Sequence, residues 1–244
     1  AFSSVQWREA VGTQHRMAER SPRYVDQRGS SMTAHPSVRT ARPLPSRIPR
    51  IVALGEVMLR FDPGVGRIRT ARRFEVHEGG GEYNVARTSH ALFGIPAAIV
   101  TALVDDEIGH LISSQIRGSG VEDSLIKWVP ADHEPRYRNG INFTERGYGV
   151  SGAVGVSDRG NTAASTLAPH DIDWNGLFSS GEVEWFHTGG IFASLSDSCE
   201  ATVREAMAAA RANGVTVSFD TNYRASLWAD RGGREAAAAA FRDL

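Results

Sequence analysis

Residues able to bind polar ligands are concentrated in two short stretches, GGGEYNVA at 79–86 and DTNYR at 220–224. In the first stretch, Gly79, Gly80 and Gly81 precede a predicted helix, and consecutive glycines let the backbone come close to another group. Asn84 lies in the first turn of that helix and offers both a donor and an acceptor. The pattern therefore indicates a site for a polar ligand. The alternative is a tight turn in which Asn84 is a local cap.

The second stretch follows the apolar run VTVSFD at 215–220, which predicts a buried strand. In open α/β sheets, ligands bind beyond the carboxyl ends of the strands. Asn222, Tyr223 and Arg224 stand at that position, and the planar guanidinium of Arg224 suits a carboxylate or a phosphate. The alternative is a structural ion pair between Asp220 and Arg224.

Several other kinds of site are disfavoured. GYGVSG at 147–152 matches the dinucleotide pattern G-x-G-x-x-G, but strand-like residues follow it where that motif requires a helix. The chain has one lysine, Lys127, and it does not follow a glycine-rich loop. The single cysteine, Cys199, excludes an internal disulfide framework, fits a reducing cytosol and is interpreted as a small buried residue. No apolar run reaches the roughly 18 residues of a membrane helix.

The formal net charge of -1 conceals an asymmetry. Residues 1–50 hold nine arginines against three acidic residues, together with half of the ten prolines. We predict that residues 1–49 are a disordered basic extension. A transit peptide or a nucleic-acid-binding arm is an alternative, but the stretch lacks interleaved aromatic residues. We favour upstream sequence outside the fold, with a natural start near Met32, and no nucleic-acid or membrane partner.

The remaining sequence alternates between strand and helix patterns. Strands are predicted at 50–61, closed by Gly55, and at 97–106, 183–190 and 215–220. Helices are predicted at 82–93, 107–117, after Ser196 or Ser198, and at 233–244. The first helix should bury a face made of Val85, Ala86, Ser89, Leu92 and Phe93. Residues 136–157 instead alternate polar and apolar side chains, which predicts an antiparallel ribbon. The fold class is thus α/β, a parallel sheet with helices and a small ribbon, and the α/β part looks unfinished at Leu244.

From about Arg50 to Leu244 the chain resembles the ribokinase-like (PfkB) carbohydrate kinases, and most of all the 2-keto-3-deoxygluconate kinases. The matching stretches are GEVMLRF, EGGGEYNVARTSHALFG, TALVDDEIGHLI, INFTERG, DRGNTAAS, WFHTGGIFA and SFDTNYRASLW. The resemblance implies that residues 50–244 are the N-terminal part of such a kinase domain. It implies a parallel sheet flanked by helices and an antiparallel lid with strands at about 60–80 and 136–157, with the C-terminal part missing.

The resemblance also implies roles for residues. Sugar hydroxyls would be held by Gly79, Gly80, Gly81 and Asn84, and by the lid residues Asn142, Thr144 and Arg146. Asn222, Tyr223 and Arg224 would lie on the nucleotide-phosphate side. The implied activity is the ATP- and Mg²⁺-dependent phosphorylation of a sugar or keto-sugar acid by a cytoplasmic protein that can self-associate through its lid.

Three departures from the family pattern keep alternatives open. Arg60, followed by Asp62, stands where many relatives have an acidic residue that binds sugar hydroxyls. Asn142 and Thr144 stand where keto-deoxygluconate kinases often have tyrosine and arginine, and Glu145 and Arg146 are nearby substitutes. The family's catalytic aspartate, in a G-x-G-D motif, is expected beyond Leu244.

Phosphoryl transfer needs a base for the attacking hydroxyl. The candidate substitutes in this chain are Asp105, Asp106 and Asp220, and the first two fit a helix start better. We therefore expect residues 1–244 alone to be inactive. Fructokinase-like or nucleoside-kinase-like specificity, or a non-catalytic sugar-binding or regulatory module, remains an alternative.

Overall fold

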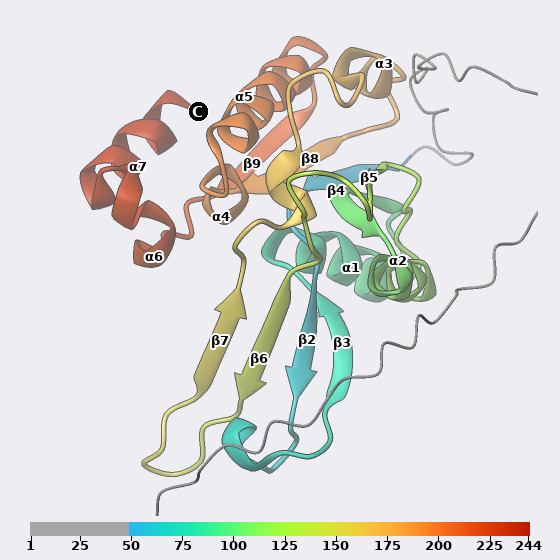
Figure 1. Ribbon diagram of the computed structural model, residues 1–244. Coiled ribbons are helices and arrows are strands. Elements are labelled where there is room, and N and C mark those ends of the chain that lie inside the picture. Colours follow the sequence, from blue (N-terminus) through green and yellow to red (C-terminus); the bar gives the residue numbers. More distant parts are fainter. Residues whose placement is uncertain (1–48) are drawn as a thin grey trace, which may run out of the picture. The chain divides into compact units, whose positions relative to one another are not determined.

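The computed structural model describes residues 49–244, so the predicted disorder of residues 1–49 falls almost wholly outside the described residues. Five parallel strands form the body sheet, in the order β5-β4-β1-β8-β9. Their bounds are β1 (Ile51–Leu54), β4 (Ala97–Asp105), β5 (Ile126–Pro130), β8 (Trp185–Gly189) and β9 (Thr216–Asp220). Figure 1 shows helices on both faces of this sheet. The predicted parallel α/β class is confirmed.

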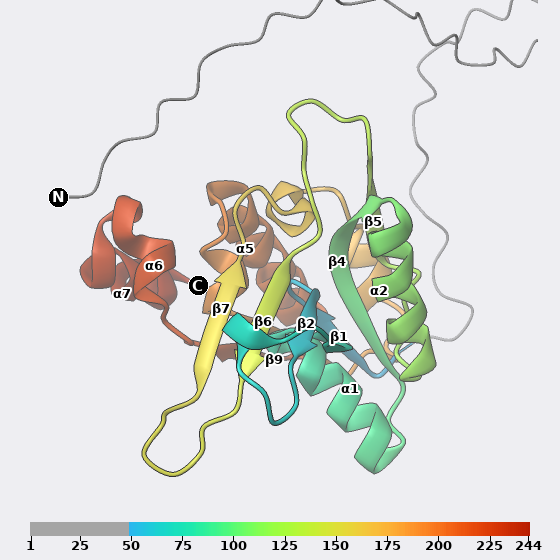
Figure 2. The ribbon, with the colours of Figure 1, turned by 60° about the horizontal axis from the view of Figure 1, so that its bottom comes forward.

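Helices α1 (Gly81–Phe93) and α2 (Glu107–Gly118) cover one face of the body sheet and lie side by side in Figures 1 and 2. Ala53, Ile99 and Leu103 pack against them. The opposite face, with Val52 and Leu54, packs against α5 (Asp197–Ala212) and its neighbours. These neighbours are η2 (Ala163–Thr166), α3 (Trp174–Phe178) and α4 (Gly190–Ala193). Successive residues of a strand therefore serve two separate cores.

The chain beyond β9 forms α6 (Ala225–Trp228), η3 (Ala229–Arg231) and α7 (Gly233–Asp243). Arg204 and Arg211 of α5 donate to the carbonyl oxygens of Asp243 and Leu244, so the end of α7 lies against α5. Within residues 49–244, no helix combines the length and the apolar character needed to cross a bilayer.

A second sheet, which we call the lid sheet, projects from the body in Figure 1. It has the order β3-β2-β6-β7, with β2 (Met58–Asp62), β3 (Glu75–Gly79), β6 (Ile141–Glu145) and β7 (Val154–Asp158), and η1 (Ile68–Thr70) lies between β2 and β3. The predicted antiparallel ribbon is present as the pair β6 and β7. However, β2 and β6 are parallel, so the sheet is mixed. The physical reason is that both strands leave the body at their first residue and run in the same direction.

Two sequence predictions need correction. The run 50–61 is not one strand, because it divides at Gly55 into β1 of the body and β2 of the lid. The predicted apolar face of α1 is also wrong in large part, since Val85, Leu92 and Phe93 are exposed and only Ala86 of that face is buried. The other buried residues of α1 are Glu82 and Tyr83. The hydroxyl of Tyr83, which donates to Glu78 at 2.8 Å, fixes this rotation of the helix.

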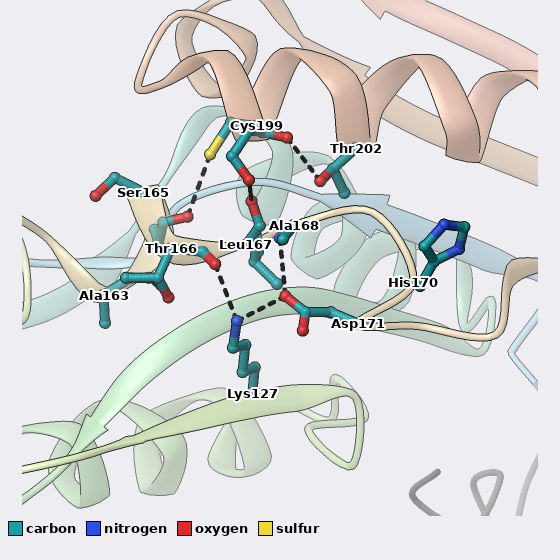
Figure 3. A network of polar contacts seen from close by, with 12 residues as sticks. Lys127, Ala163, Ser165, Thr166, Leu167, Ala168, His170, Asp171, Cys199 and Thr202 are labelled. Atoms are coloured by element: carbon teal, nitrogen blue, oxygen red, sulfur yellow. Dashed lines mark hydrogen bonds and ion pairs between the residues drawn. The ribbon is translucent and has the colours of Figure 1, made fainter. Parts of the chain in front are cut away.

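The segment that follows the lid is fastened to the body through four consecutive carbonyl groups, and Figure 3 shows the bonds made by Cys199 and Lys127. The carbonyl oxygens of residues 164, 165, 166 and 167 accept hydrogen bonds from Cys199, Ser196, Lys127 and Ser198, respectively. Lys127 also pairs with Asp171 at 2.6 Å. Cys199 is fully buried, and burial raises the pKa of its thiol to about 12, as expected of a packing residue and not of a catalytic thiol.

Candidate functional site

The three glycines at the start of α1 have different surroundings. At Gly80, an added Cβ would collide with the carbonyl oxygen of Glu56, so the backbone here packs against the protein itself. At Gly81, an added Cβ would meet nothing within 4 Å, and at Gly79 the closest atom is a guanidinium nitrogen of Arg60, at 3.6 Å. The turn is thus closed on the side of Gly80 and open on the side of Gly81.

Asn84 lies beside this open position. Its backbone N–H donates to the carbonyl oxygen of Gly80 at 2.8 Å, while its exposed side chain has no hydrogen bond to any of residues 49–244. The N-cap of α1 is Gly80, without a side-chain cap. The alternative of a local cap is therefore not what the structure shows, and the amide of Asn84 is available to a ligand.

One face of the lid sheet is polar and continues from the glycine turn. In the strand register Met58 is opposite Gly79, and Arg60 is opposite both His77 and Asn142. Because alternate residues of a strand share a face, Arg60, Asn142 and Thr144 lie on the same face as Gly79. Ser157 joins them and donates to Oδ1 of Asn142 at 3.2 Å. The sequence predictions for Asn142 and Thr144 thus fall on one surface with the glycine turn.

The remaining lid residues, Arg146 and Glu145, lie farther from the glycine turn, and each has a partner within the lid. Arg146 pairs with Asp62 at 3.0 Å near the far end of the lid sheet, which lowers the pKa of that aspartate. Glu145 lies on the opposite face, where it pairs with Arg67 and accepts from the backbone N–H of Ile68 at 3.0 Å. The expectation that Glu145 could replace a substrate-binding residue is wrong, because the strand alternation turns it away from Asn142.

The D-T-N-Y-R stretch follows the carboxyl end of β9. Asp220 accepts from the backbone N–H of Asn222 at 3.0 Å. Arg224 is exposed, and its one hydrogen bond among the described residues is to the carbonyl oxygen of Tyr223, at 3.4 Å. The alternative ion pair between Asp220 and Arg224 is not formed. The guanidinium of Arg224 therefore retains donors for an anion.

The glycine turn and the D-T-N-Y-R stretch approach each other at Gly189, the last residue of β8. An added Cβ at Gly189 would lie 2.7 Å from Oε1 of Glu82 and 3.2 Å from the carbonyl oxygen of Asp220. The carboxyl group of Glu82 is also in contact with Gly55. Burial is the main cause that raises the pKa of Glu82, the charges of Glu56 and Asp220 add to it and Arg159 opposes them, with a resulting pKa of about 7. Glu82 is therefore largely protonated below neutral pH.

A second buried carboxyl group, Glu56, pairs with Arg159 at 3.2 Å. Glu56 is 3% exposed, and burial raises its pKa against the opposing charge of Arg159. No motif in the sequence marks Glu56, Glu82 or Arg159 as site residues. Glu56 and Arg159 are 103 positions apart (159 minus 56), and no local pattern connects them.

The aspartates considered as a catalytic base are already engaged. Asp106 caps α2 by accepting from the backbone N–H of Gly109 at 2.7 Å, as its position predicted. Asp105 pairs with His110 at 3.0 Å. Asp220 is the remaining one, and its Oδ1 is bonded within its own turn. The G-Y-G-V-S-G stretch forms the β6–β7 turn, so it is not a dinucleotide motif.

Comparison with known proteins gives consistent matches. The chain is 31% identical over 192 residues to the 2-dehydro-3-deoxygalactonokinase of Haloferax volcanii, covering 78% of this chain and 57% of that protein. It is 32% identical over 182 residues to the 2-dehydro-3-deoxygluconokinase of Thermoproteus tenax, covering 74% and 52%. The chain therefore spans about half of the length of these relatives.

A solved structure gives the same result. The crystal structure of 2-dehydro-3-deoxygluconokinase from Thermotoga maritima superposes with a TM-score of 0.66 at 34% identity, covering 73% of this chain and 52% of that one. Residues 49–243 match the family described as pfkB family carbohydrate kinase. With its parallel body sheet, its lid sheet and its glycine turn, the chain belongs to the pfkB family of carbohydrate kinases.

Proposed function

We propose that the chain provides the sugar-binding half of an ATP-dependent kinase for a 2-keto-3-deoxy sugar acid, and that Gly79, Gly80, Gly81 and Asn84 hold the sugar. The observation that carries the proposal is the unpaired amide of Asn84, beside an open glycine and below the polar face of the lid sheet. The two relatives named for 2-dehydro-3-deoxy sugar acids support this class of substrate.

The charge of the lid face fits an acidic sugar. Arg60 is exposed on this face and has no ion pair with any described residue, and its guanidinium lies beside Gly79. An arginine can bind a carboxylate through two parallel hydrogen bonds. Asn142 and Thr144 then offer polar contacts to the hydroxyl groups. In this arrangement the carboxylate of the sugar faces Arg60, and its hydroxyl groups face Asn84 and the lid.

The phosphate side is assigned to Asn222, Tyr223 and Arg224. The free donors of Arg224 fit the phosphates of ATP, which supplies the transferred phosphoryl group. Among residues 49–244, no cluster of three or more histidine, cysteine, aspartate or glutamate side chains can hold a metal ion. Mg²⁺ therefore fits as an ion brought with the nucleotide phosphates, as is usual in kinases.

Residues 1–244 alone are proposed to bind the sugar without transferring phosphate. Of the three aspartates considered as a base, Asp105 and Asp106 have structural partners, and Oδ1 of Asp220 is bonded to the backbone N–H of Asn222. Self-association through the lid is a further part of the proposal. Apart from Glu145, the face of the lid opposite Arg60 is apolar, with Phe61 and Phe143 stacked at 5.0 Å and with Val154 and Val156 exposed.

The test is a calorimetric titration of the chain with 2-keto-3-deoxygluconate and with fructose. Asn84→Ala should weaken binding of the sugar acid by about 1–3 kcal/mol, the usual loss for an unpaired buried partner. Thr88→Ala, one turn further along α1, is the matched control and should leave the affinity unchanged. Arg60→Gln should weaken binding of the acid more than that of fructose.

Each result has a defined meaning. Equal affinities for wild type and Asn84→Ala would remove Asn84 from the site. Equal effects of Arg60→Gln on both ligands would exclude a carboxylate at Arg60 and would favour a neutral sugar. An ATP-coupled assay of the same chain should give no turnover above background. Clear turnover would show that a base exists among these residues.

A further inference from the structure

The chain passes between the body and the lid sheet four times. The first crossing is 55–57, between β1 and β2, and the second is Gly80, between β3 and α1. The third crossing ends at 138–140, before β6, and the fourth is 159–162, after β7. Any movement of the lid must pass through these crossings, so the contacts among them determine how the lid is coupled to the body.

Glu56 lies on the first crossing and touches the second through its backbone. Its carbonyl oxygen occupies the space that a side chain at Gly80 would need. The same glycine is the N-cap of α1, and Asn84 donates to its carbonyl oxygen. The main chain of Glu56 is therefore in direct contact with the turn that presents Asn84.

The side chain of Glu56 reaches the other two crossings. An added Cβ at Gly140 would lie 3.0 Å from Oε1 of Glu56, so the third crossing packs against the carboxyl group. Arg159, on the fourth crossing, pairs with Oε2 at 3.2 Å. The third and fourth crossings are also bonded to each other, because the backbone N–H of Arg138 donates to the carbonyl oxygen of Asn161 at 3.1 Å. All four crossings thus meet at one residue.

A contribution to folding stability does not explain well why the charged side chain of Glu56 is buried at the base of the lid sheet. Glu56 is 3% exposed, and neither of its carboxylate oxygens has a hydrogen bond of good geometry to a described residue. A buried ion pair gains little over an apolar substitute, while loss of one partner leaves an uncompensated charge. In some proteins a buried ionic contact instead specifies one arrangement of the groups that it joins, and the contacts of Glu56 fit that role.

The partner of Glu56 belongs to the anchored part of the molecule. Arg159 lies four positions before the start of η2, and the carbonyl groups at 164 to 167 are fixed to β5, to α5 and to its N-cap. The ion pair therefore connects the first lid crossing to a fixed point of the body. The lid sheet cannot tilt at Glu56 without separating this pair or moving Gly80.

We propose that Glu56 is a positioning residue that fixes the base of the lid sheet relative to Gly80, so that the polar lid face and Asn84 stay aligned across the sugar site. The contacts of Glu56 exist without any sugar. The part of the proposal that concerns sugar binding rests on the proposed function.

The test uses Glu56→Gln in the chain 1–244, with amide hydrogen exchange measured without any sugar. Amides of Gly80 to Asn84 and of the first residues of β2 and β6 should exchange at least tenfold faster than in wild type. Glu145→Gln is the matched control, because it removes a different buried ion pair of the lid, with Arg67. Its effect should be confined to the region of η1 and the end of β6, away from the crossings.

Affinity for 2-keto-3-deoxygluconate is the second readout and should fall at least tenfold in Glu56→Gln. Arg159→Met should reproduce the faster exchange, and the double variant should add little to either single change. If Glu56→Gln does not fold, the hydrogen exchange and sugar affinity of Arg159→Met provide the test. Exchange within twofold of wild type at Gly80 to Asn84, or additive effects in the double variant, would overturn the proposal. A wild-type chain that binds no sugar acid contradicts the proposed function, while the exchange data still decide the role of Glu56.

Discussion

Glu82 illustrates how a single residue connects the two halves of the site. Its carboxyl group lies between Gly55 and Gly189, where any larger residue would collide with it. Through Gly189 it also lies close to Asp220, at the start of the D-T-N-Y-R stretch. Glycine at these two strand ends is therefore required by the side chain of a third residue, and not by the backbone conformation.

The raised pKa of Glu82 predicts a pH-dependent stability. A group whose pKa is raised in the folded state stabilises that state while protonated, and this contribution is lost as the pH rises through the folded value. For Glu82 this contribution is lost over the pH range from the ordinary pKa of 4.5 to the folded pKa of about 7. The difference between these pKa values corresponds to on the order of 3 kcal/mol of folding stability. The free energy of unfolding should therefore fall between pH 5 and pH 8.

Chemical denaturation of wild type and Glu82→Gln at both pH values checks this expectation. In Glu82→Gln, the free energy of unfolding should fall less between pH 5 and pH 8 than in wild type, and the variant should be more stable than wild type at pH 8. Glu235→Gln, an exposed change on α7, is the control and should retain the wild-type slope. If Glu82→Gln and wild type decline in parallel, Glu82 does not titrate in this range.

At the scale of elements, the turn between β3 and α1 depends on one of its three glycines. Gly80→Ala should destabilise the chain by about 3 kcal/mol, the upper end of the cost of overpacking, because the new methyl group meets the carbonyl oxygen of Glu56. Gly81→Ala has open space and lies at the first position of a helix, where it should gain up to about 1 kcal/mol. Urea denaturation of the two variants measures both effects. A neutral Gly80→Ala would mean that the turn moves away from Glu56 at little cost.

Local patterns predicted most of the elements correctly. The alternation of strands and helices, the helix start at Ser196 and the ribbon of β6 and β7 are all found. These features are determined by residues that are close together in the sequence, so local sequence patterns predict them. The place of the D-T-N-Y-R stretch at the carboxyl end of a parallel strand, β9, was likewise predicted from the apolar run before it. The glycine turn was predicted from the helix that follows it, since β3 itself is antiparallel to β2.

The failures depend on contacts between distant segments. The apolar residues of α1 suggested a buried face with Leu92 and Phe93, but the fully buried Tyr83 and its bond to Glu78 set the rotation of the helix. The parallel pairing of β2 with β6 and the pair of Glu56 with Arg159 join segments that no short window contains.

At the scale of the whole molecule, the apolar face of the lid sheet predicts association of two chains. Val156 is 50% exposed beside the stacked pair Phe61 and Phe143. Sedimentation velocity should detect a dimer of wild type. Val156→Asp should weaken it at least tenfold, which corresponds to about 1.4 kcal/mol.

Val150→Asp is the matched control for this experiment. Val150 is fully exposed in the β6–β7 turn and lies outside both strands, so a charge there should leave the dimer intact. A wild-type chain that sediments as a monomer at every concentration would contradict self-association through the lid.

The place of β1 in the body sheet has a consequence for synthesis on the ribosome. β1 is an early strand, yet it is the central one, between β4 and β8. Thr188 of β8, which donates to the carbonyl oxygen of Leu54, emerges 134 residues later. At ~5–20 residues per second, one edge of β1 stays without its native neighbour for on the order of 10 s. Translation speed and chaperones acting in that interval should therefore influence the yield of folded protein more strongly than they would for a sheet assembled strand by strand.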